Sequence, residues 1–243
     1  MCDTCGCQSE HEATIKKPGE HHHHHHPHKV EVNKNLLHDN DLMAERNRGY
    51  FEARNIVSIN LVSSPGAGKT TLLEKTITAL HNELTFYVVA GDQHTLNDAK
   101  RIEQTGAPGV QINTGTGCHL NADMVHSAIK ELNPSDFSLV MIENVGNLVC
   151  PALFDLGESQ RIVMISVTEG EDKPLKYPYM FTSANICIIN KTDLLPYLTF
   201  DINQLRENIK QVNHHMEVFE ISAQTGEGLK PWFDWLIRQQ KST

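Results

Sequence analysis

Three cysteines stand close together at the beginning of the chain, in the segment CDTCGC that contains Cys2, Cys5 and Cys7. Cysteines this close in sequence indicate a metal site rather than disulfides when thiols are kept reduced. The free α-amine or a deprotonated amide could add a fourth ligand, which gives the square-planar nitrogen–sulfur geometry that suits Ni²⁺. We therefore expect a tight nickel site at the N-terminus.

A run of six histidines follows, and its imidazoles offer a second pool of metal ligands. Two interpretations are open: an affinity tag that says nothing about function, or a natural metal buffer. The run is internal and continues into Pro27-His28, which favours the natural buffer. We expect weak nickel binding by this run, which consists of His21, His22, His23, His24, His25 and His26.

A third group of ligands lies further along the chain, with Cys118-His119 after the loop TGTG and Cys150 just before a proline. Two thiolates and an imidazole suit Zn²⁺ or Ni²⁺, and the sequence does not distinguish the two. Because three ligands leave a tetrahedral site incomplete, a second copy of the chain or a partner is expected to complete it. Cys187, inside an apolar run, is expected to be only a buried small residue.

The segment SSPGAGKT at residues 63–70 has the spacing of a phosphate-binding loop, with Ser63 where the general pattern begins with glycine. Backbone N–H groups and the start of the following helix can hold the β-phosphate there. Lys69 is expected to reach the β- and γ-phosphates, and the Thr70 hydroxyl to bind Mg²⁺. The residues expected to surround the phosphates are Pro65, Gly66, Ala67, Gly68, Lys69, Thr70 and Thr71.

The segment NKTD at residues 190–193 predicts that the bound base is guanine, with an ATPase as the alternative interpretation. Asp193 can accept hydrogen bonds from the N1–H and the exocyclic amine of guanine, a donor pair that adenine lacks. Leaving such a buried group unpaired costs about 1–3 kcal/mol, which favours GTP. Lys191 can lie along the base, and a backbone N–H after the last strand can meet guanine O6. The expected base-binding residues are Asn190, Lys191, Asp193, Ser222 and Ala223.

Carboxylates end two of the apolar runs, Asp92 in VVAGD and Glu143 in LVMIE. Both are expected in the Mg²⁺ shell, directly or through water. Asp98 could orient the attacking water, and the sequence does not separate it from Asp92 in that role. Gly146 would let the backbone swing toward a γ-phosphate, as switch segments do. Because no built-in arginine finger is evident, slow hydrolysis is expected. The expected catalytic residues are Lys69, Asp92, Asp98 and Glu143.

Composition divides the chain into three parts. Residues 1–35 are rich in Cys and His with few core-forming residues, and are expected to be disordered without metal. Residues 36–52 carry apolar side chains at seven-residue spacing, which predicts an amphipathic helix on the main domain rather than a coiled coil. Residues 53–243 alternate continuous apolar runs with amphipathic stretches. This pattern predicts an α/β P-loop NTPase with a doubly wound, mainly parallel sheet and flanking helices.

Charge and hydropathy exclude several classes of protein. The formal net charge of −9 argues against a nucleic-acid groove, which needs clustered Lys and Arg. No apolar run approaches the roughly 20 residues that span a bilayer, so no membrane partner is expected. The N-terminus lacks the layout of a signal peptide, which places the protein in the cytoplasm.

The segments CDTCGC, SSPGAGKTT, GTGCHL, ENVGNLVCP and NKTD, together with the histidine run, closely resemble the hydrogenase nickel-incorporation GTPases of the HypB family. The resemblance covers nearly the whole chain. It implies the P-loop fold of MinD and the signal-recognition GTPases, with a GTP-dependent homodimer. It also implies a metallochaperone that inserts Ni(II) into the precursor of the nickel–iron hydrogenase large subunit, with GTP binding and hydrolysis gating the transfer.

The resemblance also assigns ligands and partners. It implies tight nickel binding by the N-terminal cysteines, a zinc or nickel site at Cys118, His119 and Cys150, and GTP at the phosphate-binding loop and Asp193. The implied cofactors are GTP, Mg²⁺, Ni²⁺ and Zn²⁺. The implied partners are a HypA-type zinc accessory protein and the hydrogenase precursor, with urease maturation served in some members. Many relatives lack either the cysteine segment or the histidine run.

Other classes of protein fit the sequence less well. A nickel storage protein would use the same tail, but it would need neither a switch nor a guanine-reading NKTD. A related metallochaperone GTPase for urease or cobalamin would keep the nucleotide domain without the CDTCGC segment. A small-molecule kinase would need an acceptor pocket, and the sequence has no motif for one.

Overall fold

The computed structural model describes the backbone of residues 27–92 and 97–241, and the side chains of residues 36–92 and 100–241. The expected nickel ligands Cys2, Cys5 and Cys7 and the run at 21–26 lie outside the described residues. The side chain of Asp98 also lies outside them.

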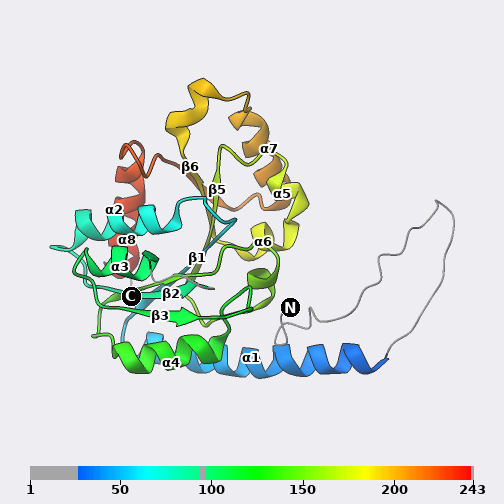
Figure 1. Cartoon of the computed structure of the whole chain (residues 1–243), viewed down its shortest axis with the longest axis vertical. Coiled ribbons are helices and arrows are strands. Elements are labelled where there is room, and N and C mark those ends of the chain that lie inside the picture. Colours follow the sequence, from blue (N-terminus) through cyan, green and yellow to red (C-terminus); the bar gives the residue numbers. More distant parts are fainter. Residues whose placement is uncertain (1–26, 93–96, 242–243) are drawn as a thin grey trace.

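A seven-stranded sheet forms the centre of the described chain, and all of its strands are parallel (Figure 1). The strand order is β3-β2-β4-β1-β5-β6-β7, so the chain winds outward from β1 in both directions. This confirms the predicted doubly wound α/β fold of the P-loop class. The strands are β1 (Val57–Ser63), β2 (Phe86–Asp92), β3 (Gly109–Asn113), β4 (Leu139–Glu143), β5 (Gln160–Ser166), β6 (Ile186–Asn190) and β7 (Glu217–Glu220).

Helices cover both faces of this sheet. They are α1 (Pro27–Ala53), α2 (Lys69–Leu80), α3 (Asn97–Glu103), α4 (Ala122–Leu132), α5 (Lys173–Lys176), α6 (Pro178–Ser183), α7 (Ile202–Val212) and α8 (Leu229–Lys241). Two short 3₁₀ helices, η1 (Cys150–Leu153) and η2 (Thr192–Tyr197), follow β4 and β6. Among the described residues, no helix is long and apolar enough to cross a membrane.

Alternating strand residues fill separate cores on the two faces, because successive side chains of a strand point in opposite directions. Ile59 and Leu61 of β1 pack with α2, α3 and α8 on one face. Val140 and Ile142 of β4 pack with α1 and α4 on the other. On the first face, Trp232 of α8 donates from Nε1 to the Thr76 hydroxyl of α2 at 3.0 Å, so the C-terminal helix is fastened to the helix that follows the phosphate-binding loop.

Helix α1 begins at Pro27, nine residues before the helix expected at residues 36–52, and the expected boundary near residue 35 stays a prediction. The helix packs along α4 (Figure 1), as its apolar stripe predicted. Phe51 is buried in the shared core, and the stripe continues through the buried amide of Asn47. Asn47 donates to Ala122 O at 2.8 Å and to Leu156 O at 3.0 Å. These two hydrogen bonds compensate for burying the polar amide of Asn47 between α1 and α4.

Candidate functional site

The segment between β1 and α2 forms a loop around a cavity of about 450 Å³. Lys69 is buried and donates from Nζ to Ser63 Oγ at 2.8 Å, which holds its side chain back along the loop. Gly68 has a φ of 105° and ends the loop, and a Cβ there would lie 2.5 Å from Asn190 Nδ2. Only glycine fits that backbone and that contact. The loop thus exposes backbone to the cavity at the N-terminus of α2, the arrangement that binds phosphate.

The two carboxylates that were expected near Mg²⁺ reach the same cavity from β2 and β4. The sheet register pairs Glu143 with Leu61 of β1 and Ala90 of β2, so these strand ends meet at one edge. Glu143 is buried and accepts a hydrogen bond from Thr70 Oγ1 at 2.7 Å. Asp92 also lines the cavity. A hydroxyl and two carboxylates on one wall form a donor set that suits a hard cation such as Mg²⁺.

A buried asparagine organises the end of the site that is expected to bind guanine. Asn190 donates from Nδ2 to Ala67 O at 2.8 Å and accepts from Ala223 N at 2.9 Å. It therefore ties the end of β6 both to the phosphate-binding loop and to the loop after β7. The N–H of Ala223, which we expected to meet guanine O6, has Asn190 as its partner in this structure.

The side chains that should read the base extend from the start of η2. Lys191 adopts a left-handed backbone with a φ of 64° and donates from Nζ to Gly66 O at 2.8 Å. Asp193 Oδ1 is buried and has no hydrogen-bond partner among the described residues. A buried acceptor without a protein partner fits a ligand that brings N–H donors, as guanine does.

The third group of expected ligands comes together in the structure. The ligand atoms of Cys118, His119 and Cys150 all lie within 4.8 Å of one another. Both cysteines are partly exposed, whereas the imidazole is buried and stacks on the Phe154 ring at 3.9 Å between centroids. Burial lowers the pKa of His119, which favours the neutral imidazole that metals require. These three donors suit Zn²⁺ or Ni²⁺.

Two asparagines connect the segment of residues 144–149, which follows β4 and is called here the switch segment, to this cluster. Asn144 is buried, and its Oδ1 accepts from the backbone N–H of Leu120, at 3.1 Å, just after the Cys-His pair. Its Nδ2 donates to Asn60 Oδ1 in β1 at 3.3 Å. Asn147 donates from Nδ2 to the carbonyl oxygen of Cys118 at 3.3 Å. The nucleotide end and the metal cluster are therefore joined by hydrogen bonds as well as by the chain.

The switch segment also lies against the phosphate-binding loop. A Cβ added to Gly146 would lie 2.9 Å from Pro65 Cα and 3.0 Å from its backbone nitrogen. Because the close neighbours are backbone atoms, a larger residue would have to separate the two segments. The glycine expected to give the switch its freedom thus also permits this approach.

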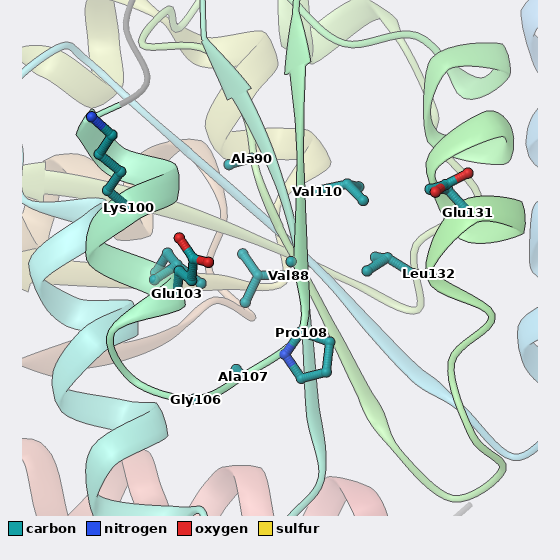
Figure 2. Close-up of a pocket in the computed structure, with 12 residues that line it drawn as sticks. Val88, Ala90, Lys100, Glu103, Gly106, Ala107, Pro108, Val110, Glu131 and Leu132 are labelled. Atoms are coloured by element: carbon teal, nitrogen blue, oxygen red, sulfur yellow. The ribbon is translucent and has the colours of Figure 1, made fainter.

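A larger cavity, of about 800 Å³, lies away from all of these residues, around the edge strand β3 between α3 and α4 (Figure 2). Its walls include Val88, Val110 and Leu132, with Lys100 and Glu131 beside them. No residue of the expected site lines it. We therefore place the functional site at the carboxyl edge of the sheet, where the motifs meet.

The parallel sheet, the loop between β1 and α2 and the carboxylates beside it define a P-loop nucleotide-binding protein. Comparison with known proteins agrees, because residues 57–220 match the family described as "CobW/HypB/UreG, nucleotide-binding domain". The chain is 51% identical over 211 residues to the hydrogenase maturation factor HypB of Escherichia coli K12, with 87% of this chain and 73% of the relative aligned.

Solved structures show the same likeness. HypB from Helicobacter pylori in complex with nickel is 36% identical, with a TM-score of 0.78 over 84% of this chain and 96% of that chain. The hydrogenase maturation factor HypB from Archaeoglobus fulgidus is 37% identical, with a TM-score of 0.78 over 83% and 98% of the two chains. The chain belongs to the HypB family of hydrogenase maturation factors.

Proposed function

We propose that this chain is a GTP-hydrolysing nickel metallochaperone that inserts Ni(II) into the nickel–iron hydrogenase precursor, with GTP binding and hydrolysis gating the transfer. One observation carries the proposal: Glu143, which accepts from the Mg²⁺-binding candidate Thr70, lies seven positions before Cys150 on one connection. Asn144 and Asn147 of this connection are bonded to the loop that carries Cys118 and His119. A change at the γ-phosphate can therefore move the metal ligands.

The nucleotide roles follow from the positions of the side chains. Lys69 neutralises the β- and γ-phosphates, and Thr70, Asp92 and Glu143 hold Mg²⁺ directly or through water. Asp193 accepts the guanine donors. Either Asp92 or Asp98 orients the attacking water.

The metal roles divide between two places. The N-terminal Cys2, Cys5 and Cys7 hold about one Ni²⁺ tightly, because thiolates are stronger soft donors than the imidazoles at 21–26. Cys118, His119 and Cys150 form the nucleotide-sensitive site, where Zn²⁺ and Ni²⁺ are both candidates. The H. pylori relative, solved in complex with nickel, supports nickel as a ligand of this family.

The remaining proposals concern partners and place. Three protein ligands leave the cluster open, so a second copy of the chain in a GTP-dependent homodimer is one way to complete it. A HypA-type accessory protein and the hydrogenase precursor are the proposed partners in the transfer, with urease maturation as a further acceptor route. The proposed compartment is the cytoplasm, where thiols stay reduced.

The test of gating measures metal affinity in two nucleotide states. It uses the full-length chain with Cys2, Cys5, Cys7 and His21–His26 replaced by serine, called here the tail-substituted chain. Ni²⁺ and Zn²⁺ are titrated into the protein loaded with GDP or with a non-hydrolysable GTP analogue, and Cys118→Ser in the same background is the control. We expect affinities that differ by about 5–150-fold between the states, and an equal reciprocal effect of metal on nucleotide affinity. Identical affinities with unchanged oligomer size would contradict gating.

A second test concerns the base and the rate. GTP hydrolysis should be slow and Mg²⁺-dependent, with ATP a poor substitute, and Asp193→Asn should shift preference toward xanthosine triphosphate. Equal turnover of ATP and GTP by the wild-type chain would remove the guanine assignment. The N-terminal site is tested separately, because Cys→Ala at 2, 5 and 7 should abolish the tightest Ni²⁺ site, whereas loss of the histidine run should only lower the stoichiometry.

A further inference from the structure

A guanidinium lies on the wall of the phosphate cavity, although no sequence motif predicted an arginine there. Arg101 of α3 lines the cavity together with Lys69, Thr70, Thr71 and Asp92. It comes from a different helix than the phosphate-binding loop, and α3 packs beside α2 at the N-terminal turn of that helix. Spacing along the chain therefore could not reveal this proximity.

The guanidinium is held by two side chains of α2. Arg101 donates from Nη2 to Thr71 Oγ1 at 3.0 Å and from Nε to Glu74 Oε1 at 2.9 Å, and Nη2 also pairs with Glu74 Oε2. Thr71 directly follows the Mg²⁺-binding candidate Thr70 in the first turn of α2. The positive fork thus sits at the end of a helix where backbone N–H groups and the macrodipole favour an anion.

We propose that Arg101 binds the phosphates of the guanine nucleotide and exchanges part of its pairing with Glu74 to do so, an inference that rests on the proposed function. A bound triphosphate carries more negative charge than Mg²⁺ and Lys69 neutralise together. A guanidinium matches phosphate oxygens in a bidentate way that a lysine does not. Arg101 is thereby a phosphate-binding residue that the chain supplies to itself.

Two features keep the free-energy cost of this exchange of partners low. The ion pair is partly open to solvent, with side-chain exposures of 40% for Arg101 and 26% for Glu74, so the carboxylate can turn to water when it loses its partner. A pair this exposed contributes little to stability. Helix α3 has a separate anchor in Ile102, which is buried in the core shared with α2 and α8. The helix can therefore keep its place while the guanidinium changes partner.

The experiment separates phosphate binding from helix packing. Affinities for GDP, a non-hydrolysable GTP analogue and guanosine are measured for the full-length wild type, Arg101→Gln, Arg101→Lys and Glu74→Gln. We expect Arg101→Gln to weaken both nucleotides by about 10–100-fold, the range for a lost charge-assisted hydrogen bond, and to leave guanosine unchanged. Arg101→Lys should retain part of the affinity. Glu74→Gln should bind the nucleotides as tightly as wild type or more tightly, because the competing carboxylate is gone.

The opposite pattern would overturn the inference. If Arg101→Gln and Glu74→Gln lower the melting temperature alike and neither changes the ratio of GDP to guanosine affinity, the pair only holds α3 on α2. Should Arg101→Gln fail to fold, Glu74→Gln decides, because a loss of GDP affinity in that variant contradicts the exchange. If the wild type bound guanosine but neither nucleotide, the proposed function would fail first and this inference with it.

Discussion

The end of the site that is expected to bind guanine, called here the guanine end, lies around Asn190. The metal end is the candidate cluster of Cys118, His119 and Cys150, and the two ends are built in opposite ways. At the guanine end, Asn190 is 2% exposed and bonds directly to two other loops. At the metal end, Cys118 and Cys150 are only half-buried as residues, and Cys150 begins a short 3₁₀ helix. Val149 before this helix and Leu153 at its end are 57% and 55% exposed. The first end is fixed by buried hydrogen bonds, whereas the second has large exposed apolar side chains beside it.

This difference in packing indicates which end can change its structure when the other end binds a ligand. The buried bonds of Asn190 hold its two loops in one arrangement, since moving either loop leaves polar groups unsatisfied. The cluster of Cys118, His119 and Cys150 has more freedom, because three protein ligands do not complete a tetrahedral site and Cys150 follows Gly146 on the same segment. We therefore expect base recognition to stay constant while metal affinity changes with nucleotide state.

The largest expected effect is on the metal end. Cys150→Ala in the tail-substituted chain should weaken Zn²⁺ and Ni²⁺ binding by more than the roughly 10–100-fold that loss of an outer partner costs. Cys187→Ala is the matched control: burial raises the pKa of the Cys187 thiol far above its usual range, so it stays protonated and should not bind metal. Competition with a chromogenic chelator measures both. Equal affinities in the two variants would remove Cys150 from the site.

A similarly large effect is expected at the guanine end. Asn190→Ala leaves Ala67 O and Ala223 N without partners, at about 1–3 kcal/mol for each buried group. GDP affinity should fall by about 100-fold, because the two loops lose their common tether. Calorimetric titration with GDP checks this. Asn213→Ala, which removes bonds to Phe181 O and Ala184 O, should lower stability without changing GDP affinity.

The third effect concerns the hydrogen bonds of Asn144 that join the two ends, and it should change the coupling between them without removing either site. Asn144→Ala removes the bonds to Leu120 N and Asn60 Oδ1, so the ratio of metal affinities in the GDP and GTP-analogue states should fall from the expected 5–150-fold toward about one. The same titrations in the tail-substituted chain measure it. Asn208→Ala on α7, which loses a bond to Glu171 O, should keep the full ratio. A full ratio in Asn144→Ala would mean that the coupling runs through another contact.

The smallest effect is expected where α1 meets the segment after η1. Arg48 Nη2 pairs with Asp155 Oδ2 at 2.6 Å. Burial raises the pKa of Asp155, but the Gly157 N–H and the Arg48 charge outweigh it, so this pKa lies below its usual value. Because the folded pKa is lowered, the pair stabilises the protein above about pH 4, and that stability is lost as pH falls through the folded pKa. Asp155→Asn should lower the free energy of unfolding by about 0.2–1 kcal/mol at neutral pH, a small value because the pair is partly exposed. Below the folded pKa of Asp155 the substitution should have no effect. Urea unfolding at several pH values measures the difference.

Much of the fold followed from sequence because strands covered on both faces must be apolar throughout. Strand β3 (Gly109–Asn113) was missed, since it is an edge strand with partly exposed residues and has no continuous apolar run. The apolar stripe predicted a helix only from residue 36, because the residues before it lack that stripe, whereas α1 begins at Pro27.

The phosphate-binding loop and NKTD were predictable because their spacing is local, and the structure brings them to one edge. The set Cys118, His119 and Cys150 was grouped from sequence, and the structure gathers its ligand atoms. The tethers were not predictable: Asn144 reaches a loop 24 positions earlier, and Arg101 meets a glutamate 27 positions away. Such contacts depend on how helices and strands pack, which no short pattern records.

The hydrogen bond between α8 and α2 has a spectroscopic consequence. Both tryptophans of the chain, Trp232 and Trp235, lie on α8 and stack at 5.3 Å between ring centroids. Trp232 donates to Thr76 on the helix whose N-terminus is the phosphate-binding end. All of the indole emission of the chain therefore arises from the core that α8 shares with α2. Intrinsic fluorescence should report movement transmitted along the phosphate-binding helix without an added label.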